Sequence, residues 1–530
     1  VVILGLILFL NPGLFNAVTS VGGAGLRDAK LASDSLTALY ACFAVSGLLG
    51  GSVANYLGLR ATLCIGSTGY SLYIAALLTS HIVGPKVDAF VITAGCILGI
   101  TAGLLWTAYG TLILSLPTES QKGVWLSIPW ALFNLGDVIG AALLLGETSD
   151  RSQGSVSTAG YSVVLGLTFL AIFLPWTMMP PRKITRSDGT RVITPRHPTF
   201  VSELKGLVHC FWSDPIFLLM VPFFFISNSF YAYHFNCFNL GLFSIRSRAL
   251  NSLLYWIAQA MTAPLLGLIL DSPRFSRRTR AKIGFCIVLA LVMAVWGPTY
   301  HIQHSFSREN PKRLDYEELQ MGKAYYAGVS ILYFFCGVCD SSWQLYAYWV
   351  MGALSNNPRR LAYYNSLYKG LQSAGNAVFW RLDSYGVPFM TMLVATWASL
   401  GASLVLAAPM IIFRIRDFTT TDVRIVETEE QLDETTYTTI GTMENAHPSG
   451  ETISLEDHHL RQRGASRFAA DDDDDKALSK LETIEETPSV LARQASAAHP
   501  SSSFYEDKVI KEEEEEEENV YPDGNTRSHC

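Results

Sequence analysis

A stripe of amide, hydroxyl and ammonium groups runs through the otherwise apolar stretch 348–383. Its members are spaced three or four residues apart and are Asn365, Lys369, Gln372, Ser373 and Asn376. That spacing places them on one face of a helix. Buried amides and ammonium groups cost free energy unless they meet partners or water. The stretch therefore predicts a membrane helix that faces a protein-lined cavity, where a polar solute can bind.

Two acidic residues also lie within apolar stretches, Asp137 and Asp340, and Gln344 follows Asp340 by one helical turn. The depths predicted for Asp340 and Lys369 differ by only about 5 Å. A lone charge at mid-membrane costs at least about 2.5 kcal/mol, so we expect these two residues to form an ion pair. A structural pair is the favoured interpretation, a substrate-binding or proton-coupling pair is the second, and no contact is the third.

Further polar residues complete the set of candidate cavity residues. The set is Asn16, Asn134, Asp137, Asp340, Gln344, Lys369, Gln372 and Asn376. For Asp137, a satisfied buried carboxyl is favoured over an ion or proton site. Pro12 is expected to kink the first helix. The aromatic run 223–235 is expected at the outer interface of the membrane, and a place in the cavity lining is the alternative.

Glycines spaced by four residues, at Gly95, Gly99 and Gly103, predict close helix packing. Helices that slide past one another during a transport cycle are the less favoured interpretation of the same spacing.

Apolar runs of about twenty residues recur through positions 1–413, long enough to cross a hydrocarbon layer of roughly 30 Å. The sequence begins inside such a run, so we expect it to start at or within the first membrane helix. Twelve helices are predicted. They are 1–21, 36–57, 61–82, 88–115, 122–146, 157–179, 214–238, 248–270, 282–300, 323–352, 360–382 and 387–413.

Charge divides the chain and orients it. The segment 414–530 carries 29 Asp and Glu against 12 Lys and Arg, whereas the rest is net positive. Lys and Arg gather in alternate loops, above all 180–213, which predicts a cytoplasmic side that holds both termini. We expect an N-terminal six-helix half (1–179), a cytoplasmic linker (180–213), a C-terminal six-helix half (214–413) and a disordered acidic cytoplasmic tail (414–530). This is the plan of a major facilitator protein.

Catalytic motifs are not found. Cys336 and Cys339 form a CxxC pair inside a predicted helix, without the further ligands that a metal or redox site needs. Neither a phosphate-binding loop nor an HExxH motif occurs. We therefore expect no enzyme, no catalytic residue, no metal and no cofactor.

Four segments resemble the uncoordinated-93-like proteins, fungal branch. They are NPGLFNAVTSVGGAG at 11–25, WTAYG at 106–110, KGVWLSIPWALFNLGDVIGA at 122–141, and the stretch 348–383. The resemblance implies the major facilitator fold: an all-α membrane protein with twelve transmembrane helices in two halves. Some animal members of that family are channel accessory subunits or receptor-trafficking chaperones, whereas fungal members are mostly described only as predicted membrane transporters. It implies no catalytic residues.

Two functions follow. The favoured one is a secondary transporter of a small solute by alternating access, coupled to a proton or another ion. The alternative is a non-transporting accessory or trafficking subunit for a membrane-protein partner. Both functions require an integral multi-pass protein in a lipid bilayer, plasma membrane or endomembrane, and nothing indicates a nucleic-acid partner. Charge runs at 471–475 and 512–518 predict disorder in the tail.

Overall fold

The computed structural model describes residues 1–26, 28–116, 122–148, 155–180, 183–184, 215–315, 324–354 and 358–417. Over these residues the chain is almost entirely helical. Most of the predicted linker 180–213 and tail 414–530 lies outside the described residues.

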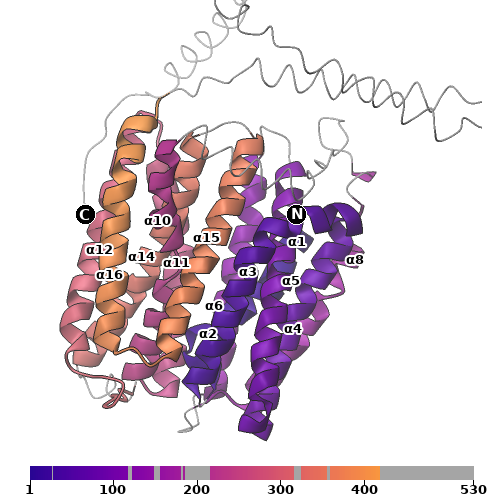
Figure 1. The fold of residues 1–530 in the computed structure, drawn as a ribbon, viewed down its shortest axis with the longest axis vertical. Helices are drawn as coiled ribbons and strands as arrows, with labels where there is room; N and C mark the ends of the chain where they lie inside the picture. Colours follow the sequence, from indigo (N-terminus) through magenta and orange to yellow (C-terminus); the bar gives the residue numbers. More distant parts are fainter. Residues whose placement is uncertain are drawn as a thin grey trace, which may run out of the picture. The chain divides into compact units, whose positions relative to one another are not determined.

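The helices fall into two groups along the chain (Figure 1). The N-terminal group is α1 (Val2–Leu8), η1 (Phe9–Gly13), α2 (Leu14–Ser20), η2 (Gly23–Gly25), α3 (Ala29–Leu57), α4 (Leu59–Val83), η3 (Pro85–Val87), α5 (Asp88–Ser115), α6 (Lys122–Thr148), α7 (Thr158–Ala171) and α8 (Leu174–Thr177). The C-terminal group is η6 (Pro215–Met220), α10 (Val221–Phe225), η7 (Ala232–Leu240), α11 (Ile245–Leu270), α12 (Arg277–Gln303), α14 (Ala324–Leu354), α15 (Pro358–Ser384), α16 (Phe389–Pro409) and η8 (Met410–Arg414).

Nine segments of the described chain are long and apolar enough to cross a membrane. They correspond to nine of the twelve predicted helices. Two of the other three are present as long helices, α14 with 31 residues and α15 with 27. The polar stripe lowers the hydropathy of α15, and for that reason composition alone does not select it as a span.

The prediction of one continuous helix over 214–238 is wrong. The segment consists of η6, α10 and the π-helical η7, with turns at 226–229. Hydroxyl and amide side chains compete for backbone hydrogen bonds in this stretch, and the Ser229 hydroxyl bonds to the Phe225 carbonyl at 3.1 Å. The interruption places Asn228 in the interior.

The first membrane segment is irregular at the place where a kink is predicted. Pro12 lies inside η1, a π-helical turn between α1 and α2. A π-helical turn leaves the regular i→i−4 ladder, and such turns are frequent at functional sites. The neighbouring Asn11 amide donates to the Ser67 hydroxyl of α4 at 3.0 Å, so this irregular turn is tied to the next helix layer.

Close contacts between glycines and backbone join α3 to α5. A Cβ atom on Gly95 or Gly99 would lie 2.4 Å or 2.1 Å from the carbonyl oxygen of Ser35 or Leu39, and one on Gly103 would meet the Ser46 hydroxyl. These glycines therefore occupy a helix interface inside the N-terminal group. Between the two groups, α3 packs against α15 and α6 against α11.

Candidate functional site

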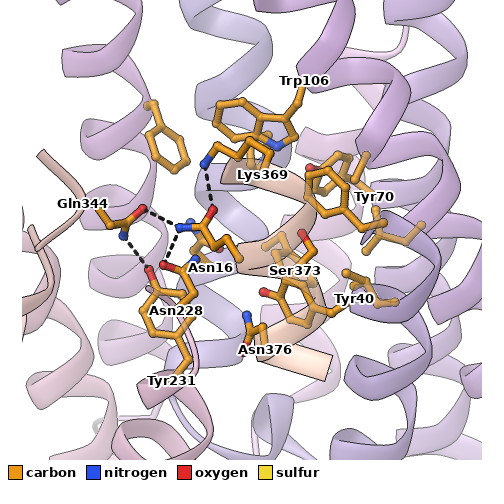
Figure 2. A pocket seen from close by; sticks show the side chains of 18 of the residues that line it. Asn16, Tyr40, Tyr70, Trp106, Asn228, Tyr231, Gln344, Lys369, Ser373 and Asn376 are labelled. Atoms are coloured by element: carbon orange, nitrogen blue, oxygen red, sulfur yellow. Dashed lines mark hydrogen bonds between the residues drawn. The ribbon is translucent and has the colours of Figure 1, made fainter. Parts of the chain in front are cut away.

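A cavity of about 90 Å³ lies where the two groups of helices meet. Helices of the N-terminal group contribute aromatic rings and Asn16 to its lining, and the C-terminal group contributes most of the polar side chains (Figure 2). The polar lining is Asn16, Tyr40, Tyr70, Asn228, Tyr231, Gln259, Gln344, Lys369, Gln372, Ser373 and Asn376. The cavity has room for several water molecules or one small solute.

Lys369 of α15 is the cation of this lining. Its ammonium donates to the Gln372 side-chain oxygen at 3.0 Å. The ammonium also lies 5.3 to 5.6 Å from the ring centroids of Trp106, Tyr348 and Tyr368. Aromatic faces stabilise a desolvated cation, and Trp106 belongs to the other group of helices. The charge of Lys369 is therefore held at the boundary between the two groups.

The predicted ion pair between Asp340 and Lys369 is wrong. Among the described residues, no salt bridge joins them; two glutamines lie between. The Gln372 amide nitrogen donates to the Gln344 side-chain oxygen at 3.3 Å. The Gln344 amide nitrogen in turn donates to the Asp340 carboxylate at 2.8 Å. Glutamine side chains of the same two helices lie between the two charges.

Asp340 is satisfied by neutral donors. One carboxylate oxygen accepts from the Tyr255 hydroxyl at 2.9 Å and from Gln259 at 2.6 Å, and the other accepts from Gln344. The side chain is buried and does not line the cavity. These three hydrogen bonds compensate the desolvation of the buried carboxylate. Two of the donors, Gln344 and Gln259, line the cavity, so they connect Asp340 to it.

The aromatic run 223–235 lies in the interior rather than at a membrane interface, which corrects the favoured prediction. Tyr231 and Asn228 line the cavity. Tyr233 and His234 are buried deeper; the Tyr233 hydroxyl donates to Gln303 at 2.7 Å, and a His234 ring nitrogen lies 3.3 Å from the Tyr255 hydroxyl. Aromatic composition alone did not separate an interfacial belt from a core.

Two of the predicted cavity residues, both on α6, do not line the cavity. Asn134 bonds to the Trp130 carbonyl of its own helix at 2.9 Å. Asp137 is completely buried, and neither carboxylate oxygen has a hydrogen-bond partner within the part of the chain that the structure describes. Of the predicted set, Asn16, Gln344, Lys369, Gln372 and Asn376 line the cavity, whereas Asn134, Asp137 and Asp340 do not.

A second polar cluster joins the two groups at the end where α3 begins and α15 ends. This Asp383 cluster consists of Ser33, Asn236, Arg308 and Asp383. The Asp383 carboxylate accepts from Ser33 at 2.6 Å and from Asn236 at 2.7 Å, and it pairs with Arg308. Asn236 in turn accepts from the Gly23 backbone N–H at 2.7 Å.

A more exposed ion pair, Arg381 with Asp34 at 2.6 Å, flanks the Asp383 cluster. Sequence reasoning missed both. The available signal was Asp383 at the end of the polar helix, together with Arg308 in a loop on the side predicted to be poor in basic residues. Spacing along the chain does not connect residues 33, 236, 308 and 383.

Comparison with known proteins gives the same family over most of the chain. A family model described as "Ion channel regulatory protein UNC-93" matches residues 32–407. The "UNC93-like protein C922.05c" of Schizosaccharomyces pombe is 40% identical over 415 residues, 78% of this chain and 82% of that protein. "UNC93-like protein 1" of Arabidopsis thaliana is 34% identical over 418 residues, 78% of this chain and 90% of that protein.

Solved structures share the fold at low sequence identity. A D-xylose-proton symporter aligns with a TM-score of 0.53 at 15% identity, over 78% of this chain and 97% of that one. A peptide transporter in complex with alafosfalin aligns with a TM-score of 0.52 at 16% identity, over 78% of this chain and 95% of that one. These similarities show the major facilitator fold.

Proposed function

This chain belongs to the UNC-93 family and is a non-enzymatic multi-pass membrane protein, and from that premise we propose that it is a secondary transporter of a small solute by alternating access. The observation that carries the proposal is the cavity between the two groups of helices. It is lined by polar and aromatic side chains from both groups. Sites in this position are typical of transporters built from two repeated halves.

In this proposal the chain crosses the bilayer twelve times as two six-helix halves, with both termini in the cytoplasm. The Asp383 cluster then faces the outer side. Its hydrogen bonds from Ser33 to Asp383 and from Gly23 to Asn236 run between the groups. Breaking them is a requirement for opening the cavity outward, so the cluster serves as the outer gate.

Asp340 is the proposed coupling site. The carboxylate is buried within α14 and is joined to the cavity through Gln344. Ionisable groups inside membrane helices often mark ion and proton pathways. A proton gained or lost at Asp340 changes whether Gln344 donates to it. Because Gln344 also bonds to Gln372, that change reaches the Lys369 end of the cavity.

Uptake by purified protein in proteoliposomes tests the function. A panel of radiolabelled small solutes is compared between the unaltered protein, Lys369→Ala and Lys282→Gln, whose lysine lies exposed on α12. We expect saturable uptake that is lost in Lys369→Ala and kept in Lys282→Gln. Flux no greater than that of protein-free liposomes for every solute would reject the transport function.

A second candidate is regulation of another membrane protein, which the description of the matching family model favours. In that function the cavity is a structural remnant, and the contacts that matter lie on the lipid-facing surface. Substitutions at Lys369 and Asn376 would then leave the partner's activity and abundance unchanged. Currents through a co-expressed channel, recorded with and without these substitutions, separate the two functions.

A further inference from the structure

The ammonium of Lys369 faces the cavity without a carboxylate to neutralise it. Within the described chain, Gln372 is its one recorded hydrogen-bond acceptor. The carboxylate of Asp340 already receives three donors and lies behind Gln344. An ammonium group has three N–H donors. Two of them therefore remain for a group that enters the cavity.

Aromatic ring faces contact the ammonium of Lys369 without using up those donors. The rings of Trp106, Tyr348 and Tyr368 interact with the positive charge through their faces. A ring face is a weaker partner than an anionic oxygen. The ammonium thus lies among aromatic rings, and it makes no hydrogen bond to an anionic oxygen of the described residues.

Asn376 supplies a second, independent signal on the same helix face. It lies seven residues after Lys369, about 10 Å farther along α15. The side chain is fully buried and lines the cavity beside the Tyr40 hydroxyl, and its amide oxygen has no hydrogen-bond partner among the described residues. Buried polar groups are nearly always paired. The unpaired amide oxygen therefore points to a ligand or an ordered water.

Aromatic side chains make up much of the cavity lining around Lys369 and Asn376. Figure 2 shows Ser373 between Lys369 and Asn376, with Tyr40 and Tyr70 of the N-terminal group on one side of them. Gln372 is engaged by Asn228 at 2.9 Å and by Lys369. The middle of the cavity thus offers contacts for an apolar body, and its two ends offer polar contacts.

We propose that the cavity binds a small organic anion, whose carboxylate accepts from Lys369 and whose second polar group pairs with Asn376. The anion's apolar body lies against the rings of Tyr40 and Tyr70. This inference rests on the proposed role of the cavity as a solute site, and it adds the chemical class of the solute. No bond is made or broken, because the site binds and releases its solute intact.

Binding to purified protein in lipid nanodiscs tests the inference with matched probes. The acids are 4-hydroxybutyrate and 4-hydroxybenzoate, the neutral probes are their amides, and butyrate and benzoate lack the second polar group. We expect each hydroxy acid to bind at least about 10-fold more tightly than its amide. Lys369→Gln should weaken acid binding by at least about 30-fold, whereas Lys369→Arg should retain part of it.

Asn376→Ala should weaken the hydroxy acids by about 2- to 10-fold and leave butyrate and benzoate unchanged. Lys282→Gln is the matched loss of a lysine outside the cavity, and the thermal midpoint of each variant reports its folding. If Lys369→Gln does not fold, two comparisons still test the inference. One is the affinity of each acid against that of its amide on the unaltered protein, and the other is the effect of Asn376→Ala. Equal binding of acid and amide, or no binding of either, overturns the inference.

Uptake separates this inference from the transport function. Acids that bind in a Lys369-dependent way but do not cross proteoliposomes support the anion site and contradict transport. Saturable uptake of uncharged solutes, with acid and amide equivalent at the site, supports transport and contradicts the anion site.

Discussion

The ammonium of Lys369 on α15 lies 5.3 Å from the centroid of the Trp106 ring on α5. The contact joins the C-terminal group of helices to the N-terminal group beside the central cavity. A buried cation depends on such partners because its desolvation is costly. Any movement that separates the groups must therefore break or replace this interaction.

Replacing the Trp106 ring tests that contact. Trp106→Leu should lower the free energy of unfolding by about 1–2 kcal/mol beyond the effect of Trp106→Phe, because only phenylalanine keeps a ring face toward the ammonium. Thermal unfolding in nanodiscs measures both. In a Lys369→Met background the difference between the two variants should disappear, and persistence of the difference there would assign it to packing alone.

The glutamine bridge predicts the outcome of exchanging the two charges. In the unaltered protein, Tyr255 and Gln259 donate to the Asp340 carboxylate. In the double variant Asp340→Lys with Lys369→Asp, the same two groups face an ammonium instead. The exchanged protein should unfold at least as readily as the worse single variant. A direct ion pair would instead tolerate the exchange. Thermal midpoints of the four proteins decide, and recovery in the double variant would contradict the bridge.

The Asp383 cluster should control access to Cys237, a buried free thiol whose sulfur lies 3.7 Å from Asp383. Arg308→Gln leaves a buried carboxylate without its cation and should destabilise this end by up to about 3 kcal/mol. We expect faster maleimide labelling of Cys237 in a protein without other cysteines.

The matched control for Arg308 is Arg381→Gln, which breaks the exposed ion pair with Asp34. Exposed pairs contribute about 0–1 kcal/mol, so labelling of Cys237 should change little. Equal acceleration by both variants would mean that general loosening of the helix ends, rather than the Asp383 cluster, exposes the thiol.

Two glycines of α5 make a contrast in packing. A Cβ at Gly99 would lie 2.1 Å from the Leu39 carbonyl oxygen, whereas one at Gly110 meets nothing within 4 Å. Gly99→Ala should therefore cost about 1–3 kcal/mol through separation of α3 and α5. Gly110→Ala should be neutral or slightly stabilising. Thermal midpoints and expression yields measure both; equal losses would contradict this assignment.

Asp417, just beyond the last membrane segment, should make the local stability at the start of α12 depend on pH in the acidic range. Its carboxylate accepts from the Arg278 backbone N–H at 2.9 Å at the start of α12. That hydrogen bond, with Ser276 and the nearby arginines, holds the pKa of Asp417 below its usual value of 3.8. A lowered folded-state pKa gives stability that is fully present above 3.8 and is lost as pH falls through the folded value.

Amide hydrogen exchange at Arg278 measures the effect of Asp417. Protection should be constant from about pH 5 to 8 and fall only under more acidic conditions. Asp417→Asn should remove that acid dependence and leave weaker protection throughout. A loss of protection near neutral pH in the unaltered protein would assign it to another group.

Several features were accessible to sequence reasoning because their causes are local. Hydropathy identified the membrane segments, and a period of three to four residues placed Lys369, Gln372 and Asn376 on one face of α15. The family was recognised from contiguous segments, and the comparisons confirm it. The broken helix at 226–229 was missed, because a turn inside an apolar run depends on contacts that apolar composition does not reveal.

The sequence by itself determined that the chain is a helical multi-pass membrane protein with a polar face on α15, because burial of apolar side chains and helical periodicity act over a few turns. Only the tertiary structure decided which polar groups meet. Asp340 and Lys369 are bridged by glutamines, and Ser33 reaches Asp383 across 350 positions. Such partners are set by the packing of helices distant in sequence, where each buried polar group must find the donor or acceptor that the fold brings within about 3 Å.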